Sequence, residues 1–153
     1  MKQFNLRQID CDPSEPMFTI GFAARKIGVS PETLRLYEKE GLLITFKTPT
    51  GRRLYSPRDL AWIACIRRQI NENKLNIAGI KRLLALIPCW EIKPCAEKER
   101  KKCPAYLSNN RVCWEINETP LRCAHEDCRL CKVYLTAANV GHLKELFKMT
   151  KKD

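Results

Sequence analysis

Cysteine is the residue type in this sequence that is best placed to do chemistry, because seven of the nine cysteines lie in one short stretch. The seven are Cys89, Cys95, Cys103, Cys113, Cys123, Cys128 and Cys131. Thiolates bind zinc and iron–sulfur clusters, and they form disulfides in oxidising compartments. Residues 1–16 lack the apolar core of a secretory signal, so we expect a cytoplasmic protein whose cysteines bind metal or do redox chemistry.

The number of clustered cysteines exceeds what one metal site needs, since zinc takes four ligands and an iron–sulfur cluster usually takes four thiolates. Either two sites share ligands, or some thiols stay free for sensing. Cys128 and Cys131 are separated by two residues, a spacing that lets both sulfurs reach one metal from a tight turn. The predicted cofactor is therefore zinc or an iron–sulfur cluster. Zinc as a scaffold and a redox or metal-responsive centre are both open, with disulfides or small-molecule capture as further alternatives.

A degenerate repeat runs through the cysteine-rich stretch. Cys89–Ile92 has the same sequence, Cys-Trp-Glu-Ile, as Cys113–Ile116, and Cys103–Tyr106 shares its first and last residue types with Cys131–Tyr134. Two copies of a Cys-Trp half-site predict a pseudo-symmetric unit. The stretch resembles the small cysteine-rich unit known as a two-CW domain, found in bacterial signalling and regulatory proteins. We expect the two tryptophans to pack over the metal site, and stacking on an aromatic ligand is the alternative.

Two further cysteines and the histidine at position 125 stand outside this pattern. His125 fits no standard ligand spacing from the neighbouring cysteines, so we expect a surface histidine. Cys65 lies on a predicted helix and is expected to be a small buried residue. Cys11 has no predicted role. The sequence shows no acid–base pair, nucleophile constellation or phosphate-binding loop, so we do not expect an enzyme.

Positive charge is concentrated away from the cysteines. The 153-residue chain has a formal net charge of +11, and residues 17–86 alone hold 13 basic and 5 acidic side chains. Such a segment attracts polyanions, and its binding to nucleic acid releases counterions from the phosphates. Membrane surfaces and acidic proteins attract it too, so charge alone indicates nucleic acid only weakly. The sequence contains no apolar run long enough to cross a bilayer, and no membrane partner is expected.

The basic segment has the pattern of a helix-turn-helix. Apolar residues at helical spacing predict a helix over 18–28, ended by Gly28. Ser30 is a capping residue and Pro31 suits the first position of a second helix, which Gly41 ends. Because only two residues separate the helices, we expect them to form a helix-turn-helix.

The residues that follow predict a wing and two more helices. Residues 42–46 and 52–55 favour strands, and the residues between them favour a turn. Ser56, with a proline at the first helical position and an acid three residues after the cap, begins a helix that runs to about Asn73. A fourth helix is expected over 76–87.

In this order, the segments 18–30, 33–43 and 51–60 resemble the MerR family of transcription regulators, over roughly 70 residues. The resemblance implies a mainly α fold, a winged helix-turn-helix with four helices and a two-stranded wing. It also implies a homodimer that binds near-palindromic promoter DNA and changes transcription by bending or untwisting the DNA between the elements that RNA polymerase recognises. Deformability of the DNA between those elements is then part of the recognition.

The second helix of such a domain enters the major groove, and the wing adds contacts beside it. We therefore expect one set of residues to contact bases or phosphates. They are Thr33, Arg35 and Tyr37 on the helix and Arg52, Arg53 and Tyr55 on the wing. The family often has paired tyrosines where this chain has Leu36 and Tyr37, and we expect Leu36 to pack inside.

The family usually places a long dimerising helix after the fourth helix. Pro88, Pro94 and Pro104 interrupt the corresponding stretch, so no such helix can begin there. The candidate that is left is the segment 132–149, where apolar residues recur at spacings of three and four. These residues are Val133, Ala137, Val140, Leu143 and Phe147. The stripe could form a dimer, or it could dock on the protein's own cysteine-rich part.

The sequence thus predicts four parts: an N-terminal arm (1–16), a winged helix-turn-helix domain (17–87), a cysteine-rich metal or redox module (88–134), and a C-terminal helix with a basic tail (135–153). Residues 17–87 are called the winged domain below, and residues 88–134 the cysteine module. The leading hypothesis is a metal- or redox-responsive, DNA-binding transcription regulator. The alternative is a constitutive DNA-binding or adaptor protein whose module is a zinc-stabilised protein-interaction surface.

Overall fold

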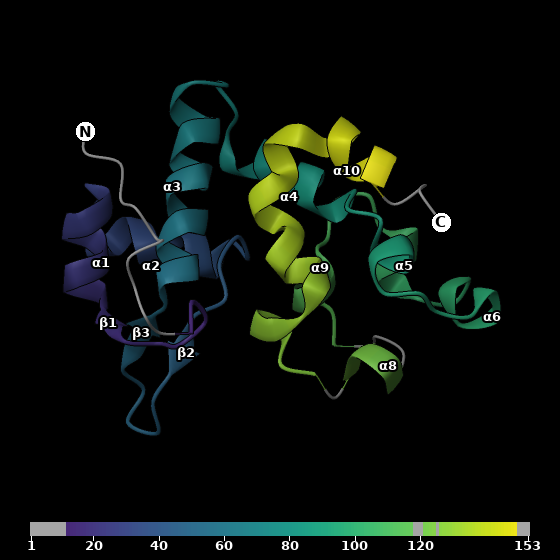
Figure 1. Ribbon diagram of the computed structural model, residues 1–153, viewed down its shortest axis with the longest axis horizontal. Coiled ribbons are helices and arrows are strands. Elements are labelled where there is room, and N and C mark those ends of the chain that lie inside the picture. Colours follow the sequence, from purple (N-terminus) through teal and green to yellow (C-terminus); the bar gives the residue numbers. More distant parts are fainter. Residues whose placement is uncertain (1–11, 118–120, 125, 150–153) are drawn as a thin grey trace.

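The computed structural model describes residues 12–117, 121–124 and 126–149. It is mainly helical with one small sheet, which confirms the predicted fold class. Figure 1 shows the winged domain on one side and most of the cysteine module on the other, with α4 (Ile77–Ala85) and α9 (Lys132–Leu135) between them. Most of the predicted N-terminal arm, including Cys11, lies outside the described residues, and so does His125.

Two helices, α1 (Ile20–Ile27) and α2 (Pro31–Lys39), form the helix-turn-helix. Ser30 caps α2 as predicted, because its hydroxyl accepts a hydrogen bond from the Thr33 N–H at 3.1 Å. The first helix begins later than predicted. The residues before it form the strand β1 (Phe18–Thr19), whose backbone groups pair with another strand.

The sheet has three strands in the order β1-β3-β2, and both pairs are antiparallel. β2 (Phe46–Lys47) and β3 (Arg53–Tyr55) form the predicted two-stranded wing, and β1 adds a strand that the sequence did not indicate. The strand predicted over 42–46 is wrong for most of its length, since only its last residue lies in β2.

The chain between α2 and β2 runs through the core without regular secondary structure. Buried backbone polar groups need hydrogen-bond partners, and here side chains supply them. The Trp62 indole N–H donates to the Leu42 carbonyl at 2.7 Å, and the Ile44 N–H donates to the Tyr134 hydroxyl at 3.0 Å. These bonds take the place of the strand ladder that the apolar pattern had suggested.

One acidic side chain fastens the wing to α2. The Glu38 carboxylate on α2 pairs with Lys47 Nζ of β2 at 2.8 Å and with Arg53 Nε of β3 at 2.5 Å. Burial of Glu38 opposes its ionisation, but the hydrogen bonds from Arg53 and Lys47 outweigh burial and hold the pKa of this carboxyl below its ordinary value. The position of the wing relative to α2 therefore depends on Glu38.

Two further helices complete the winged domain. α3 (Pro57–Asn71) begins with the predicted capping box, in which the Ser56 hydroxyl accepts from the Asp59 N–H at 3.1 Å and the Ser56 N–H donates to the Asp59 carboxylate at 2.7 Å. Asn76 caps α4 with a single bond, in which its side-chain oxygen accepts from the Gly79 N–H at 2.7 Å. Both helices start where predicted to within a residue, and both end two residues earlier.

The described part of the cysteine module contains only short helical turns. They are α5 (Cys89–Ile92), α6 (Glu97–Arg100), α7 (Pro104–Leu107), η2 (Cys113–Glu115), α8 (Leu121–Ala124), η3 (Cys128–Leu130) and α9. This agrees with the prediction that prolines prevent a long helix from starting here. No helix among the described residues is long and apolar enough to cross a membrane.

The helix predicted over 132–149 is divided into α9, the 3-10 helix η4 (Thr136–His142) and α10 (Leu143–Met149). Its apolar stripe is used inside the molecule. Val133, Ala137 and Val140 are buried in the same core as the apolar residues of the winged domain. The η4 part of the stripe docks on α3 and α4 of the winged domain, which neither expected role included. Val133 also lies beside the clustered cysteines, in line with the expected docking on the cysteine-rich part.

The packing of η4 against α3 is close. The Cys65 thiol on α3 donates to the Ala138 carbonyl at 3.4 Å, and Cys65 is buried as predicted. A Cβ added to Gly141 would come within 2.6 Å of Gln69 Nε2, also on α3. A larger residue at position 141 would therefore require the Gln69 side chain to move.

Replacing Gly41 by alanine is expected to destabilise the fold more than replacing Gly51. Both glycines have positive φ, 75° and 80°, a conformation that costs alanine about 1–2 kcal/mol. A Cβ at Gly41 would also overlap the Glu115 carboxylate, whereas nothing lies within 4 Å of a Cβ at Gly51. Urea unfolding of Gly41→Ala and Gly51→Ala at neutral pH measures the difference. Equal losses would mean that Glu115 moves aside at no cost.

The variant Glu38→Gln is expected to lower stability at neutral pH and to have less effect in acid. A carboxylate with a depressed pKa stabilises the fold above its unfolded pKa, and this contribution is lost as the pH falls through the folded pKa. The wild type and the variant should therefore converge below about pH 4.5, the ordinary value for this group. Urea unfolding at several pH values measures the convergence, with the exposed Glu72→Gln as control. A difference that stays constant with pH would contradict the ion-pair explanation.

Candidate DNA-binding surface and cysteine-lined cavity

The outward face of α2 carries side chains that are free to meet a ligand. Arg35 is exposed, and its ion pair with the exposed Glu32, at 3.1 Å, is weak because solvent screens it. Lys39 is exposed one turn further along the helix. Thr33 is half-buried, and its hydroxyl lies 3.0 Å from the Ser30 hydroxyl at the helix start. Thr33 therefore takes part in the cap of α2.

The structure reverses the expectation for the pair Leu36 and Tyr37. Leu36 is 42% exposed, whereas Tyr37 is 5% exposed and belongs to the core. Tyr37 follows the buried Leu34 by three residues and so shares its face of the helix, while Leu36 lies on the other side. Burial raises the pKa of Tyr37 above its ordinary value. Tyr37 supports α2 from behind, and Leu36 lies among the outward residues.

The three wing residues differ in exposure. Arg52 is exposed beside the turn, while Arg53 is half-buried against Glu38. Tyr55 is fully buried, and its hydroxyl has no hydrogen-bond partner among the described residues. Burial raises the pKa of Tyr55 to about 12. A phosphate contact by Tyr55 does not fit this arrangement, because its strand is the central one of the sheet and the core covers the side chain.

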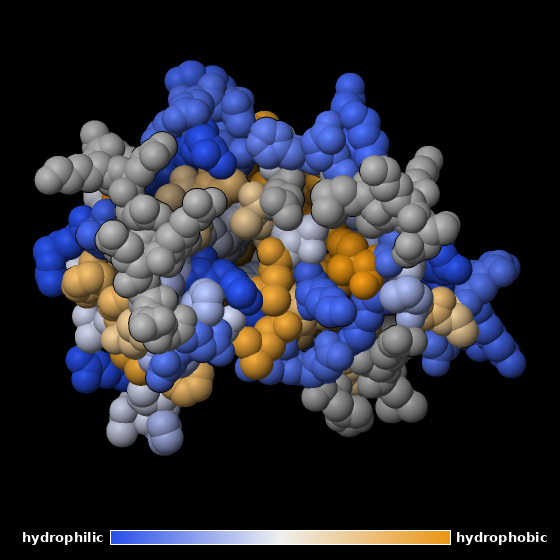
Figure 2. All heavy atoms as spheres, in the orientation of Figure 1, coloured by the Kyte–Doolittle hydropathy of each residue, from blue (hydrophilic) through white to orange (hydrophobic). Residues whose placement is uncertain are grey.

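All seven clustered cysteines line one cavity of about 260 Å³. Trp90 and Trp114 line it as well. Figure 2 shows hydrophobic side chains between α9 and α5, two of the elements that bound this cavity. Among the residues that the structure describes, no three His, Cys, Asp or Glu side chains lie close enough together to hold a metal ion. The thiols thus surround a space without converging on one point.

The thiols of this cavity influence one another's ionisation. Burial, followed by the neighbouring thiolates, raises the pKa of Cys89 to about 11 and that of Cys113 to about 12. Cys89 interacts in this way with Cys95, Cys103 and Cys123. Cys113 interacts with Cys89, Cys123, Cys128 and Cys131. Without a cation, Cys89 and Cys113 are therefore protonated at neutral pH, and a bound metal ion would favour their thiolate forms.

The repeat predicted from the sequence has a structural counterpart. In the first copy, the rings of Trp90 and Tyr106 meet edge to face at 5.0 Å, and in the second copy those of Trp114 and Tyr134 do so at 5.1 Å. The cysteine that precedes each of these tyrosines, Cys103 or Cys131, stands at the start of a short helix, α7 or α9. The two copies therefore share a local fold as well as a sequence pattern.

One element of the repeat was missed in the sequence. Cys95 and Cys123 are each followed by alanine, and the interval between them equals the interval between Cys103 and Cys131. By the same alignment, Arg100 occupies the position of Cys128 in the first copy. Three cysteines thus recur in each copy, and Cys128 has no counterpart.

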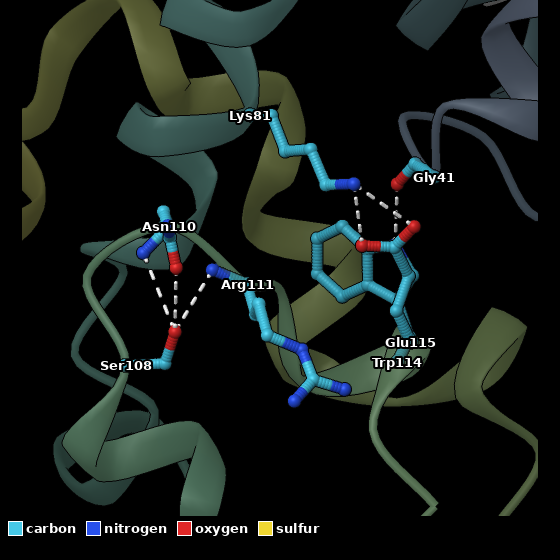
Figure 3. A network of polar contacts seen from close by, with 7 residues as sticks. All are labelled: Gly41, Lys81, Ser108, Asn110, Arg111, Trp114 and Glu115. Atoms are coloured by element: carbon cyan, nitrogen blue, oxygen red, sulfur yellow. Dashed lines mark hydrogen bonds and ion pairs between the residues drawn. The ribbon is translucent and has the colours of Figure 1, made fainter.

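The second copy is attached to the winged domain at the end of α2 (Figure 3). The Trp114 indole N–H donates to the Gly41 carbonyl at 2.7 Å. Glu115 forms an ion pair with Lys81 Nζ of α4 at 2.9 Å. Tyr134, which accepts the Ile44 N–H, is buried, and this burial raises its pKa above the ordinary value. The start of the wing and the end of α2 are thus held by residues of the cysteine module.

A neighbouring loop of the module reaches the wing itself. Arg129, between Cys128 and Cys131, lies over the Phe46 ring of β2 with its guanidinium carbon 5.6 Å from the ring centre. The Arg129 side chain also donates to the Ser14 carbonyl at 3.2 Å. Local sequence patterns gave no signal for these contacts, because the partners are far apart along the chain.

Comparison with known proteins finds similarities to the winged domain. The model of the MerR HTH family of regulatory proteins matches residues 18–87. The chain is 35% identical over 71 residues to the putative heat shock protein HspR of Streptomyces coelicolor. The aligned segment covers 46% of this chain and 47% of that protein. It is 33% identical over 73 residues to the HTH-type transcriptional regulator GlnR of Bacillus anthracis, which covers 48% of this chain and 56% of that protein.

A third relative is an uncharacterized HTH-type transcriptional regulator of Haemophilus influenzae, 38% identical over 66 residues, or 42% of this chain and 48% of that protein. The chain spans about half the length of the curated relatives it matches. The family match agrees with the resemblance seen in the sequence and with the helix-turn-helix and wing of the structure. Residues 18–87 of this chain are therefore similar to the helix-turn-helix domain of the MerR family.

Proposed function

We propose that the protein is a transcription regulator that binds duplex DNA with α2 and the wing. The observation that carries this proposal is the exposure of cations on both elements of the MerR-family domain: Arg35 and Lys39 on α2, and Arg52 beside the wing turn. Exposed arginine and lysine side chains neutralise phosphates and, in the major groove, donate to bases. Thr33 adds a short polar side chain at the start of the same helix.

Other expected contact residues are assigned supporting roles. Tyr37 and Tyr55 are buried, so they shape α2 and the wing from inside. Arg53 is held by Glu38, which makes it a positioning residue for the wing. We propose that direct contacts come from Arg35, Arg52 and their exposed neighbours.

The assembly is proposed from the family resemblance, which implies a homodimer on promoter DNA with RNA polymerase as the further partner. The apolar stripe of η4 and α9 is packed against this chain's own winged domain. The proposed dimer contact therefore uses another surface.

We propose that the cavity of the cysteine module holds zinc or an iron–sulfur cluster, and that its state alters DNA binding. Two contacts support a regulatory role over that of a separate adaptor surface. Trp114, next to Cys113, bonds to the residue that ends α2, and Arg129, next to Cys128, lies on the wing. A shift of either cysteine on metal binding or oxidation would move a side chain that touches a DNA-binding element.

The variants Arg35→Ala and Arg52→Ala are each expected to weaken DNA binding and to reduce the slope of log K against log salt by about 1, because each removes a phosphate or base contact. A gel-shift titration on a duplex selected from a random pool, at several salt concentrations, measures both quantities. Lys98→Ala, exposed on α6, is the matched control. Arg53→Ala should weaken binding to a similar extent as Glu38→Gln if it acts by positioning. Unchanged affinity and slope in both Arg35→Ala and Arg52→Ala would overturn the proposed surface.

The variant Trp114→Phe is expected to uncouple DNA binding from the state of the cysteine module. It keeps an aromatic ring beside Tyr134 but loses the hydrogen bond to the Gly41 carbonyl. The measurement compares the DNA affinity of anaerobically purified protein before and after oxidation or metal chelation. Trp90→Phe is the control, since no carbonyl in the described part of the chain accepts from the Trp90 indole. A wild-type affinity that does not respond to either treatment would favour the constitutive adaptor.

A further inference from the structure

Six of the seven cysteines that line the cavity occupy equivalent positions in the two copies of the repeat, and one does not. Each copy of the repeat supplies a cysteine before tryptophan, a cysteine before alanine and a cysteine three residues before tyrosine. The first copy supplies Cys89, Cys95 and Cys103, and the second supplies Cys113, Cys123 and Cys131. The seventh, Cys128, takes the place of Arg100.

Both copies face the same space. The six recurring thiols and both tryptophans line one cavity instead of two separate ones. A ligand in this cavity is therefore placed to receive thiols from both halves of the repeat.

The cavity is larger than the site that a single zinc ion requires. Four sulfurs bound to one zinc at about 2.3 Å lie roughly 3.8 Å from one another and leave no open space. Here the thiols surround about 260 Å³. A centre with several metal atoms holds its thiolates further apart, because bridging sulfur atoms and the metals themselves lie between them. The cavity fits that second kind of centre.

We propose that this cavity binds one polynuclear, thiolate-ligated metal centre whose ligands come from the six recurring cysteines of both copies, with Cys128 outside the ligand set. This rests on the metal-binding part of the function proposed above. The centre consists of iron with inorganic sulfide, because sulfide supplies most of the ligands of each iron and no three thiols need to meet at one metal ion. Each ligating thiol releases its proton to solvent as its sulfur binds metal. Lys93 and Arg100, which also line the cavity, partly balance the negative charge of the thiolates.

The position of Cys128 supports a separate role for it. Its turn, η3, carries Arg129, which is engaged with the wing and with Ser14. In the first copy, Arg100 stands at the position of Cys128. Its guanidinium carbon lies 5.7 Å from the centre of the Tyr106 ring. Cys128 and Cys131 therefore enclose a docking turn that is found in one copy only. The proposed ligands are the cysteines that both copies contain.

The test measures metal stoichiometry in the full-length protein. Reduced, metal-free protein is titrated with Zn²⁺ alone and, in a separate anaerobic arm, with Fe²⁺ and sulfide, and bound metal and acid-labile sulfide are counted per chain. We expect two or more iron ions per chain, together with acid-labile sulfide, in the second arm. Cys128→Ser should keep that stoichiometry, whereas Cys95→Ser and Cys123→Ser, one from each copy, should lower it or weaken binding by at least about tenfold. A single metal ion per chain, no bound metal, or an equal loss in Cys128→Ser would each overturn the proposal.

A second measurement needs no variant and so does not depend on whether the substituted proteins fold. Metal-loaded wild-type protein is alkylated with iodoacetamide, and the modified positions are located by mass spectrometry. We expect modification at Cys128 and protection at the six recurring cysteines, with protection lost after chelation. Protection of Cys128 together with modification of the first-copy cysteines would overturn the assignment. Because neither measurement uses DNA, a failure here is distinct from a failure of the proposed DNA binding.

Discussion

The structure depends on how the buried chain after α2 satisfies its backbone hydrogen bonds. This segment forms neither helix nor strand, yet it crosses the core, where an unpaired carbonyl or N–H is costly. Trp62 of the winged domain bonds to the Leu42 carbonyl, and Trp114 and Tyr134 of the cysteine module bond to Gly41 and Ile44. The winged domain is thus completed by residues that follow it in the sequence, and the end of α2 has its observed position because the module is folded against it.

Local features of the fold could be predicted because their partners are close in sequence. The hydroxyls of Ser30 and Ser56 bond three residues ahead, so their helix starts follow from residue type and spacing alone. The strand predicted over 42–46 failed for the opposite reason. An apolar run indicates that a segment is buried, but it does not indicate how the backbone of the segment is hydrogen-bonded. Here the backbone is hydrogen-bonded to side chains on distant segments.

The candidate site was predictable in part. The resemblance placed α2 and the wing correctly, but Leu36 and Tyr37 were assigned to the wrong faces, because neighbouring positions on a helix differ little in sequence pattern and packing decides between them. Glu38 and Lys47, which set the wing against α2, gave no signal beyond their opposite charges. In the cysteine module, the sequence repeat predicted a pseudo-symmetric unit. The paired Trp–Tyr contacts and the attachment of one copy to the winged domain required the structure.

The shared core has a thermodynamic consequence. Val133, Tyr134, Ala137 and Val140 belong to the same cluster of buried residues as Leu34 and Ile63 of the winged domain. Two parts with one core unfold as one cooperative unit, so a free-energy change in either is felt by both. Any ligand that binds the folded cavity and not the unfolded chain therefore stabilises α2 and the wing by mass action. The family match ends at residue 87, whereas the buried core continues beyond that residue.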